Sequence, residues 1–415
     1  MTEKMKPSGI AWIGEVPESW NLLKLKYFSY LKGRIGWQGL TADEFIDEGP
    51  YLITGTDFEN GRIQFDRSYH ISEARYAQAP EIQLQIGDLL VTKDGTVGKM
   101  AYVDELPDKA SLNSHLLLIR PLEGKYHNRF LFWLMSSSVF TGYTEYSQDG
   151  TIMASLSQEK IGNFLAYFPG LEEQCAIADF LDAQCAKIDS VIADIEKQIE
   201  TLHKYKKSLI TEAVTKGVDR SVPMKDSRVD WIGEIPSAWE AKRMKYFLSV
   251  ASGDAITNDQ LEDGDYPVFG GGKQMGWSNK HNIPGDTILI GRVGANCGCV
   301  SITPKESWAT DNALIVSTNS YVKYVYYILV AADLNKLNDA NAQPLITGAK
   351  VGNCVVPYTY KYEEQKLIAD YLDSACSKID EVLALKQQQL AKMQQHKKSL
   401  IYEYVTGKKR VTEVN

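Results

Sequence analysis

The chain carries the same sequence blocks twice, and this repeat constrains its architecture more than any other feature. The opening block Trp12-Ile13-Gly14-Glu15-Val16-Pro17 recurs 219 residues later as Trp231-Ile232-Gly233-Glu234-Ile235-Pro236, and a second tryptophan follows each copy, Trp20 and Trp239. The chain has 415 residues. A single core rarely grows beyond roughly 250–300 residues, so at least two domains are expected. The repeat predicts two similar halves related by a pseudo-twofold axis.

A second repeated block closes each half. Glu172-Glu173-Gln174 recurs 191 residues later as Glu363-Glu364-Gln365, and Lys206-Lys207-Ser208-Leu209-Ile210 recurs as Lys397-Lys398-Ser399-Leu400-Ile401. The remaining pairs are Ile177-Ala178-Asp179 with Ile368-Ala369-Asp370, and Lys187-Ile188-Asp189 with Lys378-Ile379-Asp380. Between its two blocks the second copy is 28 residues shorter. The matched parts are therefore expected to do one job twice, and the diverged middles to do two versions of another.

Each closing block lies in a long segment without proline or glycine, from Glu172 to about Thr215 and from Glu363 to Thr406. The apolar residues there alternate in spacings of four and three, with Lys206, Lys386 and Lys397 at the remaining positions, which is the heptad pattern. They are Ile188, Ile192, Ile195, Ile199, Leu202 and Leu209 in the first copy, and Ile379, Leu383, Leu390, Met393 and Leu400 in the second. Core helices usually run 8–20 residues, whereas these segments predict rods of roughly 65 Å. Two such rods in a pseudo-twofold chain are expected to pack antiparallel.

The diverged middles, residues 21–171 and 240–362, show no sustained helical period and predict α+β domains with function on loops. Gly87–Thr92 and Gly285–Ile290 are each typical of a turn that enters a buried strand, followed by the glycine-containing loops 93–99 and 292–298. Further on, Asn113-Ser114-His115-Leu116 corresponds to Asp311-Asn312-Ala313-Leu314, so Ala313 aligns with His115. The two domains are therefore expected not to share one binding specificity.

The polar residues of these loops suit contacts with DNA, because Lys and Arg pair with guanine and Asn with adenine. For any single residue an ordinary turn role is the commoner explanation. The candidate DNA-binding residues are Lys93, Thr96, Lys99, Asn113, Ser114, His115, Arg292, Asn296, Asn312 and Gln343. Supplementary contacts are expected from Thr56, Ser147, Gln148 and Thr151.

Composition narrows the function mainly by exclusion. The content of 44% hydrophobic and 24% charged residues is that of a globular protein. No apolar run reaches membrane-spanning length, and residues 1–7 lack a signal-peptide core, so a soluble cytoplasmic protein is expected. The net charge of −8 does not by itself favour nucleic acid, so a DNA-binding surface has to be local.

Catalytic and metal-binding motifs are absent from the sequence. Phe269-Gly270-Gly271-Gly272-Lys273 has the wrong spacing for a phosphate-binding loop. The sequence contains no two adjacent prolines, which excludes the acidic-Pro-Pro-aromatic signature of amino-methyltransferases. There is no His-Glu-x-x-His motif and no Gly-x-Ser-x-Gly motif, and Cys297 and Cys299 stand without further ligands nearby. We therefore expect no active site, metal or cofactor within this chain.

The repeated Trp-Ile-Gly-Glu-x-Pro-x-x-Trp opening and the repeated Glu-Gln helix with Lys-Lys-Ser-Leu-Ile near its end resemble the DNA-specificity subunit of type I restriction–modification systems, over nearly the whole chain. The resemblance implies an α+β protein with two pseudo-twofold related target-recognition domains, separated by two long antiparallel coiled-coil helices. The expected parts are residues 1–171 (first recognition domain), 172–217 (first helix), 218–362 (linker and second recognition domain) and 363–415 (second helix and tail).

The resemblance also implies partners. Each recognition domain would read half of a split double-stranded DNA site, and the helices would set the gap between the halves. Two methyltransferase subunits and the endonuclease/translocase subunits would assemble on the chain, with no membrane involved. S-adenosylmethionine, ATP and magnesium would be bound by those partners.

Two alternatives stay open at the level of sequence. One is a nuclease or a fused restriction–methylation enzyme, which the missing motifs disfavour. The other is a coiled-coil scaffold whose two diverged domains bind proteins rather than DNA, since similarity of fold alone does not establish function. A narrower variant keeps DNA recognition and couples it to another defence system.

Overall fold

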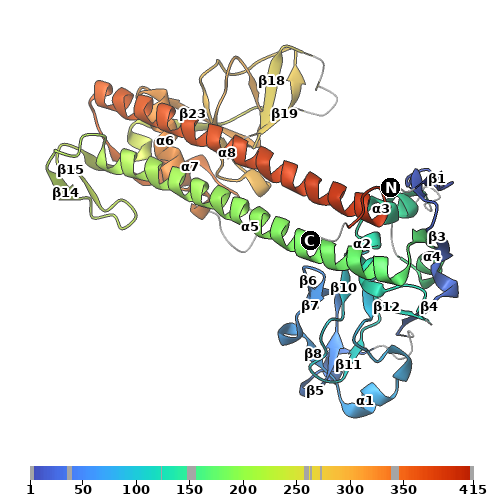
Figure 1. Cartoon of the computed structure of the whole chain (residues 1–415). Coiled ribbons are helices and arrows are strands. Elements are labelled where there is room, and N and C mark those ends of the chain that lie inside the picture. The colour runs from blue at the N-terminus through green and yellow to red at the C-terminus, as the bar shows by residue number, and fades with distance from the viewer. Residues whose placement is uncertain are drawn as a thin grey trace. The chain divides into compact units, whose positions relative to one another are not determined.

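A computed structural model describes residues 4–34, 40–122, 124–146, 156–256, 261, 264–271, 273–337 and 345–411. The chain divides into two compact units. The first unit comprises Met1–Asp194 with Gln389–Asn415, and the second unit comprises Ile195–Gln388. Figure 1 shows the blue and cyan strands of the first unit and the yellow and orange strands of the second. Each unit is a mixed assembly of strands and helices around its own core.

Two long helices run through the chain, α5 (Leu171–Lys216) and α8 (Tyr362–Val405), which confirms both predicted rods. They form because more than forty consecutive residues offer neither a proline nor a glycine to interrupt the hydrogen-bonded backbone. Gly217 and Gly407 follow the helix ends with φ values of +72° and +70°, the left-handed conformation that glycine adopts readily at a helix C-terminus.

Within each unit the two helices run antiparallel, as the sequence predicts, because the start of one packs against the end of the other. In the first unit Leu181 of α5 shares a buried cluster with Val405 of α8, and the rings of Phe180 and Tyr404 lie 4.5 Å apart. In the second unit the core contains Ile210, Ala213 and Val214 from the end of α5 and Ile368, Ala369 and Leu372 from the start of α8.

An ion pair joins the two helices in each unit, and corresponding residues form both. Lys397 Nζ lies 2.6 Å from Asp189 Oδ1 in the first unit, and Lys206 Nζ lies 2.6 Å from Asp380 Oδ1 in the second. The repeated Lys-Ile-Asp and Lys-Lys-Ser-Leu-Ile motifs supply these residues. The aspartate side chains are about half exposed, so each pair contributes about 1 kcal/mol or less to stability and mainly favours one register of the helices.

The repeated opening blocks pack on the helix ends. In the first unit Tyr402 OH donates to Ile13 O at 3.0 Å, and a Cβ at Gly407 would lie 2.4 Å from Pro17 Cγ. In the second unit a Cβ at Gly217 would lie 3.4 Å from Trp239 Cζ2. The opening block and the glycine after each helix are therefore parts of one contact, which explains why they recur together.

The two units share one strand topology. Each has an antiparallel four-stranded sheet, ordered β10-β9-β12-β4 in the first unit and β21-β20-β23-β17 in the second. The first sheet consists of β4 (Ser29–Gly33), β9 (Leu89–Thr92), β10 (Met100–Tyr102) and β12 (Leu116–Pro121). The second consists of β17 (Leu248–Ser252), β20 (Ile288–Gly291), β21 (Val300–Ile302) and β23 (Ala313–Thr318).

A three-stranded sheet accompanies each of these, with one parallel and one antiparallel pair. The first contains β5 (Ile46–Ile53), β8 (Tyr69–His70) and β11 (Ala110–Leu112). The second contains β18 (Tyr266–Gly270), β19 (Lys273–Ser278) and β22 (Trp308–Ala309). The two-stranded pairs that both units share are β1 (Met5–Pro7) with β2 (Glu15–Pro17), β3 (Asn21–Lys24) with β13 (Leu165–Phe168), β14 (Met224–Asp226) with β15 (Glu234–Pro236), and β16 (Glu240–Arg243) with β24 (Val355–Tyr358).

Short helices cover the sheets. Helices α2 (Asn128–Met135) and α6 (Val322–Ala331) are mostly buried and are equivalent in the two units, as are α4 (Gln158–Gly162) and α7 (Gly348–Asn353). The first unit also contains β6 (Phe58–Glu59), β7 (Arg62–Ile63), α1 (Glu73–Ala77) and α3 (Ser138–Tyr146). The insertion of β6, β7 and α1 between β5 and β9 accounts for much of the greater length of the first copy.

An aspartate on each long helix anchors α2 or α6. Asp182 accepts hydrogen bonds from Arg129 Nε at 2.8 Å and from Trp133 Nε1 at 2.7 Å. Its counterpart Asp373 accepts from Lys323 Nζ at 2.5 Å and from Tyr327 OH at 2.7 Å. This contact explains why the same pair of residues recurs as Leu181-Asp182 and Leu372-Asp373.

The repeated glutamine is buried in both copies. Gln174 Oε1 accepts from His127 N at 2.8 Å while its Nε2 donates to Pro169 O at 2.9 Å. Gln365 Oε1 accepts from Tyr321 N at 2.9 Å while its Nε2 donates to Thr359 O at 2.7 Å. One side chain thus satisfies two backbone groups where the long helix, the end of the last strand and the start of α2 or α6 meet.

Replacing either glutamine by leucine is expected to lower the free energy of unfolding by about 2–4 kcal/mol, because two buried backbone groups lose their partner. Urea unfolding of the full-length Gln174→Leu and Gln365→Leu proteins measures this loss. The matched control is Gln387→Leu, the same change at an exposed position of α8, which is expected to stay within about 0.5 kcal/mol of the parent. Equal losses in all three variants would contradict this role.

Candidate functional site

Three loops meet at the end of β9 in the first unit. The loop between β9 and β10 contacts the turn between β11 and β12, because Lys93 N donates to His115 O at 2.8 Å. The same loop contacts the turn that follows β5, because Lys99 Nζ donates to Gly55 O at 3.2 Å. The structure therefore brings together the predicted residues Lys93, Thr96, Lys99, Asn113, Ser114 and His115.

The side chains of this cluster differ in their exposure to solvent. Thr96, Lys99 and His115 are exposed, and Lys93, Asn113 and Ser114 are half-buried. His115 Nδ1 lies 3.4 Å from Asp94 Oδ2, so the imidazole is oriented by a neighbouring carboxylate. Asn113 Oδ1 accepts from His115 N at 3.0 Å, which gives Asn113 a structural role within the turn as well.

The turn after β5 contains a residue that sequence reasoning missed. Asp57 is buried and accepts hydrogen bonds from Thr54 N at 2.7 Å, from Thr54 Oγ1 at 3.1 Å and from Thr56 Oγ1 at 3.3 Å. Burial raises the pKa of the Asp57 carboxyl, and these hydrogen bonds oppose the rise. The spacing Thr-x-x-Asp was the available signal, since it is a helix-capping pattern. Asp57 thereby orients the exposed Thr56 next to Lys99.

The second unit builds the same kind of cluster at the end of β20. Arg292 N donates to Asn312 O at 3.0 Å. The Arg292 guanidinium also donates to Asp311 O and to Ser252 Oγ, both at 3.3 Å, so this side chain is held against the turn before β23. Asn312 is exposed and Asn296 is half-buried. Arg292, Asn296 and Asn312 thus lie in one loop cluster.

Four candidates lie outside the described residues, namely Ser147, Gln148, Thr151 and Gln343.

The structure corrects one sequence correspondence. Thr92 N bonds to Lys99 O as Gly291 N bonds to Cys299 O, and Leu116 pairs with Thr92 as Ala313 pairs with Gly291. His115 is therefore equivalent to Asn312, and Ala313 is equivalent to Leu116. The expected correspondence of Ala313 with His115 is wrong by one position.

The same shift affects the strand before the loop. Gly87 and Asp286, with φ values of +94° and +55°, occupy the equivalent left-handed turn position before β9 and β20. Sequence comparison aligned Gly87 with Gly285 because glycine usually takes such a conformation. A non-glycine residue takes it in the second unit, and the alignment moved by one residue.

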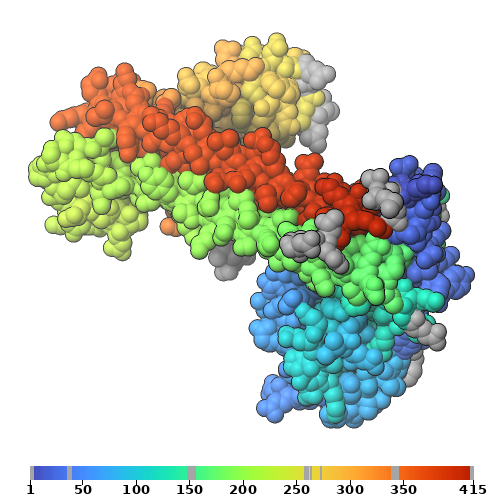
Figure 2. Space-filling view, viewed as in Figure 1, coloured from blue at the N-terminus to red at the C-terminus, as the bar shows by residue number. Residues whose placement is uncertain are grey.

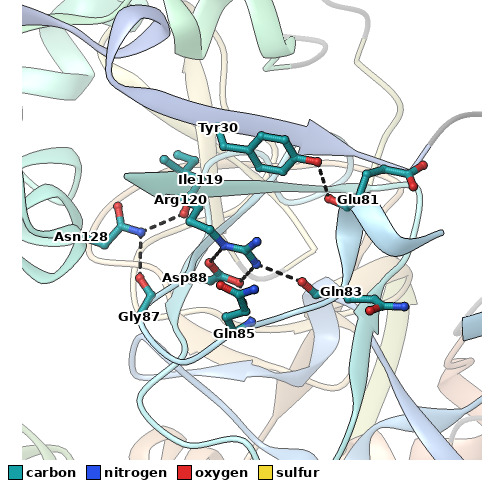
Figure 3. Close-up of polar contacts among 9 residues, drawn as sticks. All are labelled: Tyr30, Glu81, Gln83, Gln85, Gly87, Asp88, Ile119, Arg120 and Asn128. Carbon is teal, nitrogen blue, oxygen red and sulfur yellow. Dashed lines mark hydrogen bonds and ion pairs between the residues drawn. The ribbon is translucent and has the colours of Figure 1, made fainter. Parts of the chain in front are cut away.

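A buried ion pair supports the first loop cluster from the other end of β9 (Figure 3). Asp88 accepts from Arg120 Nε and Nη2, both at 2.7 Å, and from Gln85 N at 2.7 Å. Arg120 Nη2 also donates to Gln83 O at 2.9 Å, and Asn128 Nδ2 bridges Gly87 O and Ile119 O at 2.8 Å each. Burial raises the pKa of Asp88, and the bonds from Arg120 oppose the rise. Thr287 occupies the equivalent place in the second unit.

Asp88→Ala is expected to lower the free energy of unfolding by about 3–5 kcal/mol, because it leaves the partly buried Arg120 without its counterion. The side chains of Asp88 and Arg120 are 1% and 25% exposed. The control is Glu59→Ala, which breaks an ion pair with Arg67 whose side chains are 49% and 59% exposed, and which is expected to cost less than about 1 kcal/mol. Chemical unfolding compares the two losses, and a loss for Asp88→Ala no larger than for Glu59→Ala would contradict the assignment.

The part of the chain that the structure describes contains neither a cluster of metal ligands nor a membrane-spanning helix. In that part of the chain no three His, Cys, Asp or Glu side chains lie close enough together to hold a metal ion. Over the same residues no helix combines the length and apolarity needed to cross a bilayer.

Comparisons with known proteins identify the repeated domain. The family model described as "Type I restriction modification DNA specificity domain" matches residues 28–201 and again residues 236–395. The chain is 26% identical to a putative type I restriction enzyme MjaX specificity subunit of Methanocaldococcus jannaschii, over 96% of each chain. It is 25% identical to the type I restriction enzyme MjaVIII specificity subunit of the same organism, over 96% of this chain and 95% of the relative.

A solved structure shares the fold. It is described as the structural basis underlying complex assembly and conformational transition of the type I R-M system. The similarity covers 94% of this chain and 99% of the other, with a TM-score of 0.69 at 16% identity. The relatives are specificity subunits, which are the non-catalytic members of such systems. With two copies of the domain over most of its length, the chain belongs to the type I restriction–modification DNA specificity family.

Proposed function

We propose that this chain recognises a bipartite, asymmetric double-stranded DNA sequence, with one half-site for each recognition domain. The observation that carries this proposal is that one loop framework recurs with different side chains. Lys93 N bonds to His115 O in the first unit, and Arg292 N bonds to Asn312 O at the equivalent place in the second. A shared framework with different donors and acceptors suits two domains that read different bases.

The chemistry of both clusters fits base and phosphate contacts. Lys93 and Arg292 are suited to guanine O6 and N7, and Asn312 is suited to adenine. Thr96, Thr56 and Lys99 are suited to phosphate oxygens, which set the position of the protein on the duplex. Gln343 and Asn296 complete the proposed contacts of the second domain.

We propose that the repeated parts of the chain recruit its partners. Each unit joins an opening block to the end of a long helix, so the chain offers the same construction twice. This duplication suits two methyltransferase subunits, to which endonuclease/translocase subunits are added. S-adenosylmethionine, ATP and magnesium belong to those subunits in this scheme. The net charge of −8 is compatible with this scheme, because all subunits of a cytoplasmic complex share the contacts with DNA.

The test is to co-express the chain with its methyltransferase subunit in a host without DNA methylation, and to map methyladenine by single-molecule sequencing. The expected result is a split motif in which two short half-sites flank a gap of fixed length and unspecified sequence. An active, co-purifying methyltransferase complex that leaves no such mark would overturn the proposal and favour a scaffold that binds proteins.

A further inference from the structure

We propose that the hairpin of β18 and β19 reads bases of the second half-site, with Lys273 and Gln274 as specificity-determining residues. This inference rests on the proposed function and extends it to an element outside the two loops already described. It also assigns a role to the glycine-rich segment 269–273, whose spacing does not fit a phosphate-binding loop.

The hairpin turn lies in the second loop cluster. Gly271 follows β18 with a φ of +59°, a conformation that favours glycine. A Cβ built on Gly271 would lie 3.9 Å from Asn296 Cβ and 3.9 Å from Asn312 O. The end of the hairpin therefore adjoins two of the residues proposed to contact DNA.

The backbone of the hairpin turn packs closely against the backbone of the second loop cluster. A Cβ at Gly291 would lie 2.0 Å from Asn296 O and 2.7 Å from Gly271 O, so no side chain fits at this position. Gly291 directly precedes Arg292. Because Gly291 has no side chain, the backbone of the hairpin turn can lie close to the start of the Arg292 loop.

The side chains that follow the turn are available to a ligand. Lys273 and Gln274 are exposed, and Met275 is 49% exposed. Gln274 Nε2 donates a long hydrogen bond of 3.4 Å to Gly276 O, which a base edge can replace. Figure 2 shows the yellow segment that includes β18 and β19 on the outside of this unit.

A β-bulge sits at this place. The pairing passes from Phe269 with Gln274 to Val268 with Gly276, so Met275 is the additional residue. Bulges bend a strand and re-aim its side chains, and they are frequent beside functional sites. Strand β19 is also an edge strand of the sheet β19-β18-β22.

A two-stranded ribbon fits the major groove of B-DNA, where lysine pairs with guanine and glutamine with adenine. The methyl group of Met275 is suited to the apolar C5-methyl of thymine.

The first unit is built differently at the place of this hairpin, because the Thr54–Asp57 turn, β6 and β7 follow β5 before the two-residue strand β8. The hairpin is therefore a reader for one half-site.

The test compares Lys273→Ala and Gln274→Ala in the full chain, assembled with its methyltransferase, on DNA sites with every single-base change. Each variant is expected to reduce discrimination by roughly 5- to 150-fold at one or two positions of one half-site. That half-site is the one that changes when residues 240–362 are exchanged. Discrimination in the other half-site is expected to remain that of the parent protein.

Lys280→Ala is the matched control, because it removes the same charge from an exposed residue beyond the other end of β19. It is expected to leave discrimination unchanged. Variants at 273 and 274 that behave like this control, or that weaken binding equally at all positions as a phosphate contact would, overturn the inference. The parent protein reports separately on the proposed function, which fails only if the parent shows no bipartite motif.

Discussion

Exchanging residues 21–171 for the equivalent region of a relative with a different specificity is expected to replace one half-site completely and to leave the other unchanged. The reason is that each unit has its own buried cores, with the described core residues of the first unit distinct from those of the second. Methylation mapping of the exchanged protein measures both half-sites and the gap in one experiment.

The design of this exchange follows from two contacts between the replaced region and α5. The donor region has to supply a basic residue at position 129 and a ring donor at position 133 for Asp182, and a backbone N–H at position 127 for Gln174. The reciprocal exchange of residues 240–362 is the control and is expected to change only the other half-site. A change of both half-sites after either exchange would contradict modular recognition.

Inserting one heptad into each long helix is expected to lengthen the gap by about three base pairs without altering either half-site. Seven residues extend a helix by about 10 Å, and the rise of B-DNA is about 3.4 Å for each base pair. Insertion after Asp194 and after Gln388 places the added turns at the boundary between the units. The ion pairs of Asp189 with Lys397 and of Lys206 with Asp380 each stay within one unit.

The control inserts the heptad into α5 alone. The helices then no longer match in length, and loss of methylation at the extended site is expected. The motif of the doubly extended protein, mapped as for the parent, gives the gap directly. A gap of unchanged length in that protein would remove the spacer role from the helices.

The long helices and their antiparallel packing could be predicted from sequence because their signals are local and periodic. The absence of proline and glycine over more than forty residues and a heptad stripe are sufficient to predict a rod and its apolar face. The repeat adds the pairing, since residues that match by a constant offset take corresponding places in the two units.

The supporting contacts could not be predicted in this way. The repeated Gln174 and Gln365 were visible as a motif, but one backbone partner of each lies more than forty residues away. The Asp88–Arg120 pair and the position of the β18–β19 hairpin beside Arg292 likewise depend on strands that meet only in the fold. The misalignment of Gly87 with Gly285 has a local cause, because Asp286 adopts the backbone conformation that Gly87 adopts in the first unit.

The central claim is that one chain reads two half-sites at a fixed separation. The most direct measurement is competition binding of the chain, assembled with its methyltransferase, to DNA with the mapped motif, with either half-site scrambled, and with one base pair added to the gap. All three altered DNAs are predicted to bind at the non-specific level, roughly 10³-fold or more below the intact site. Full affinity for a DNA that keeps a single half-site, or for one with the longer gap, would contradict the account.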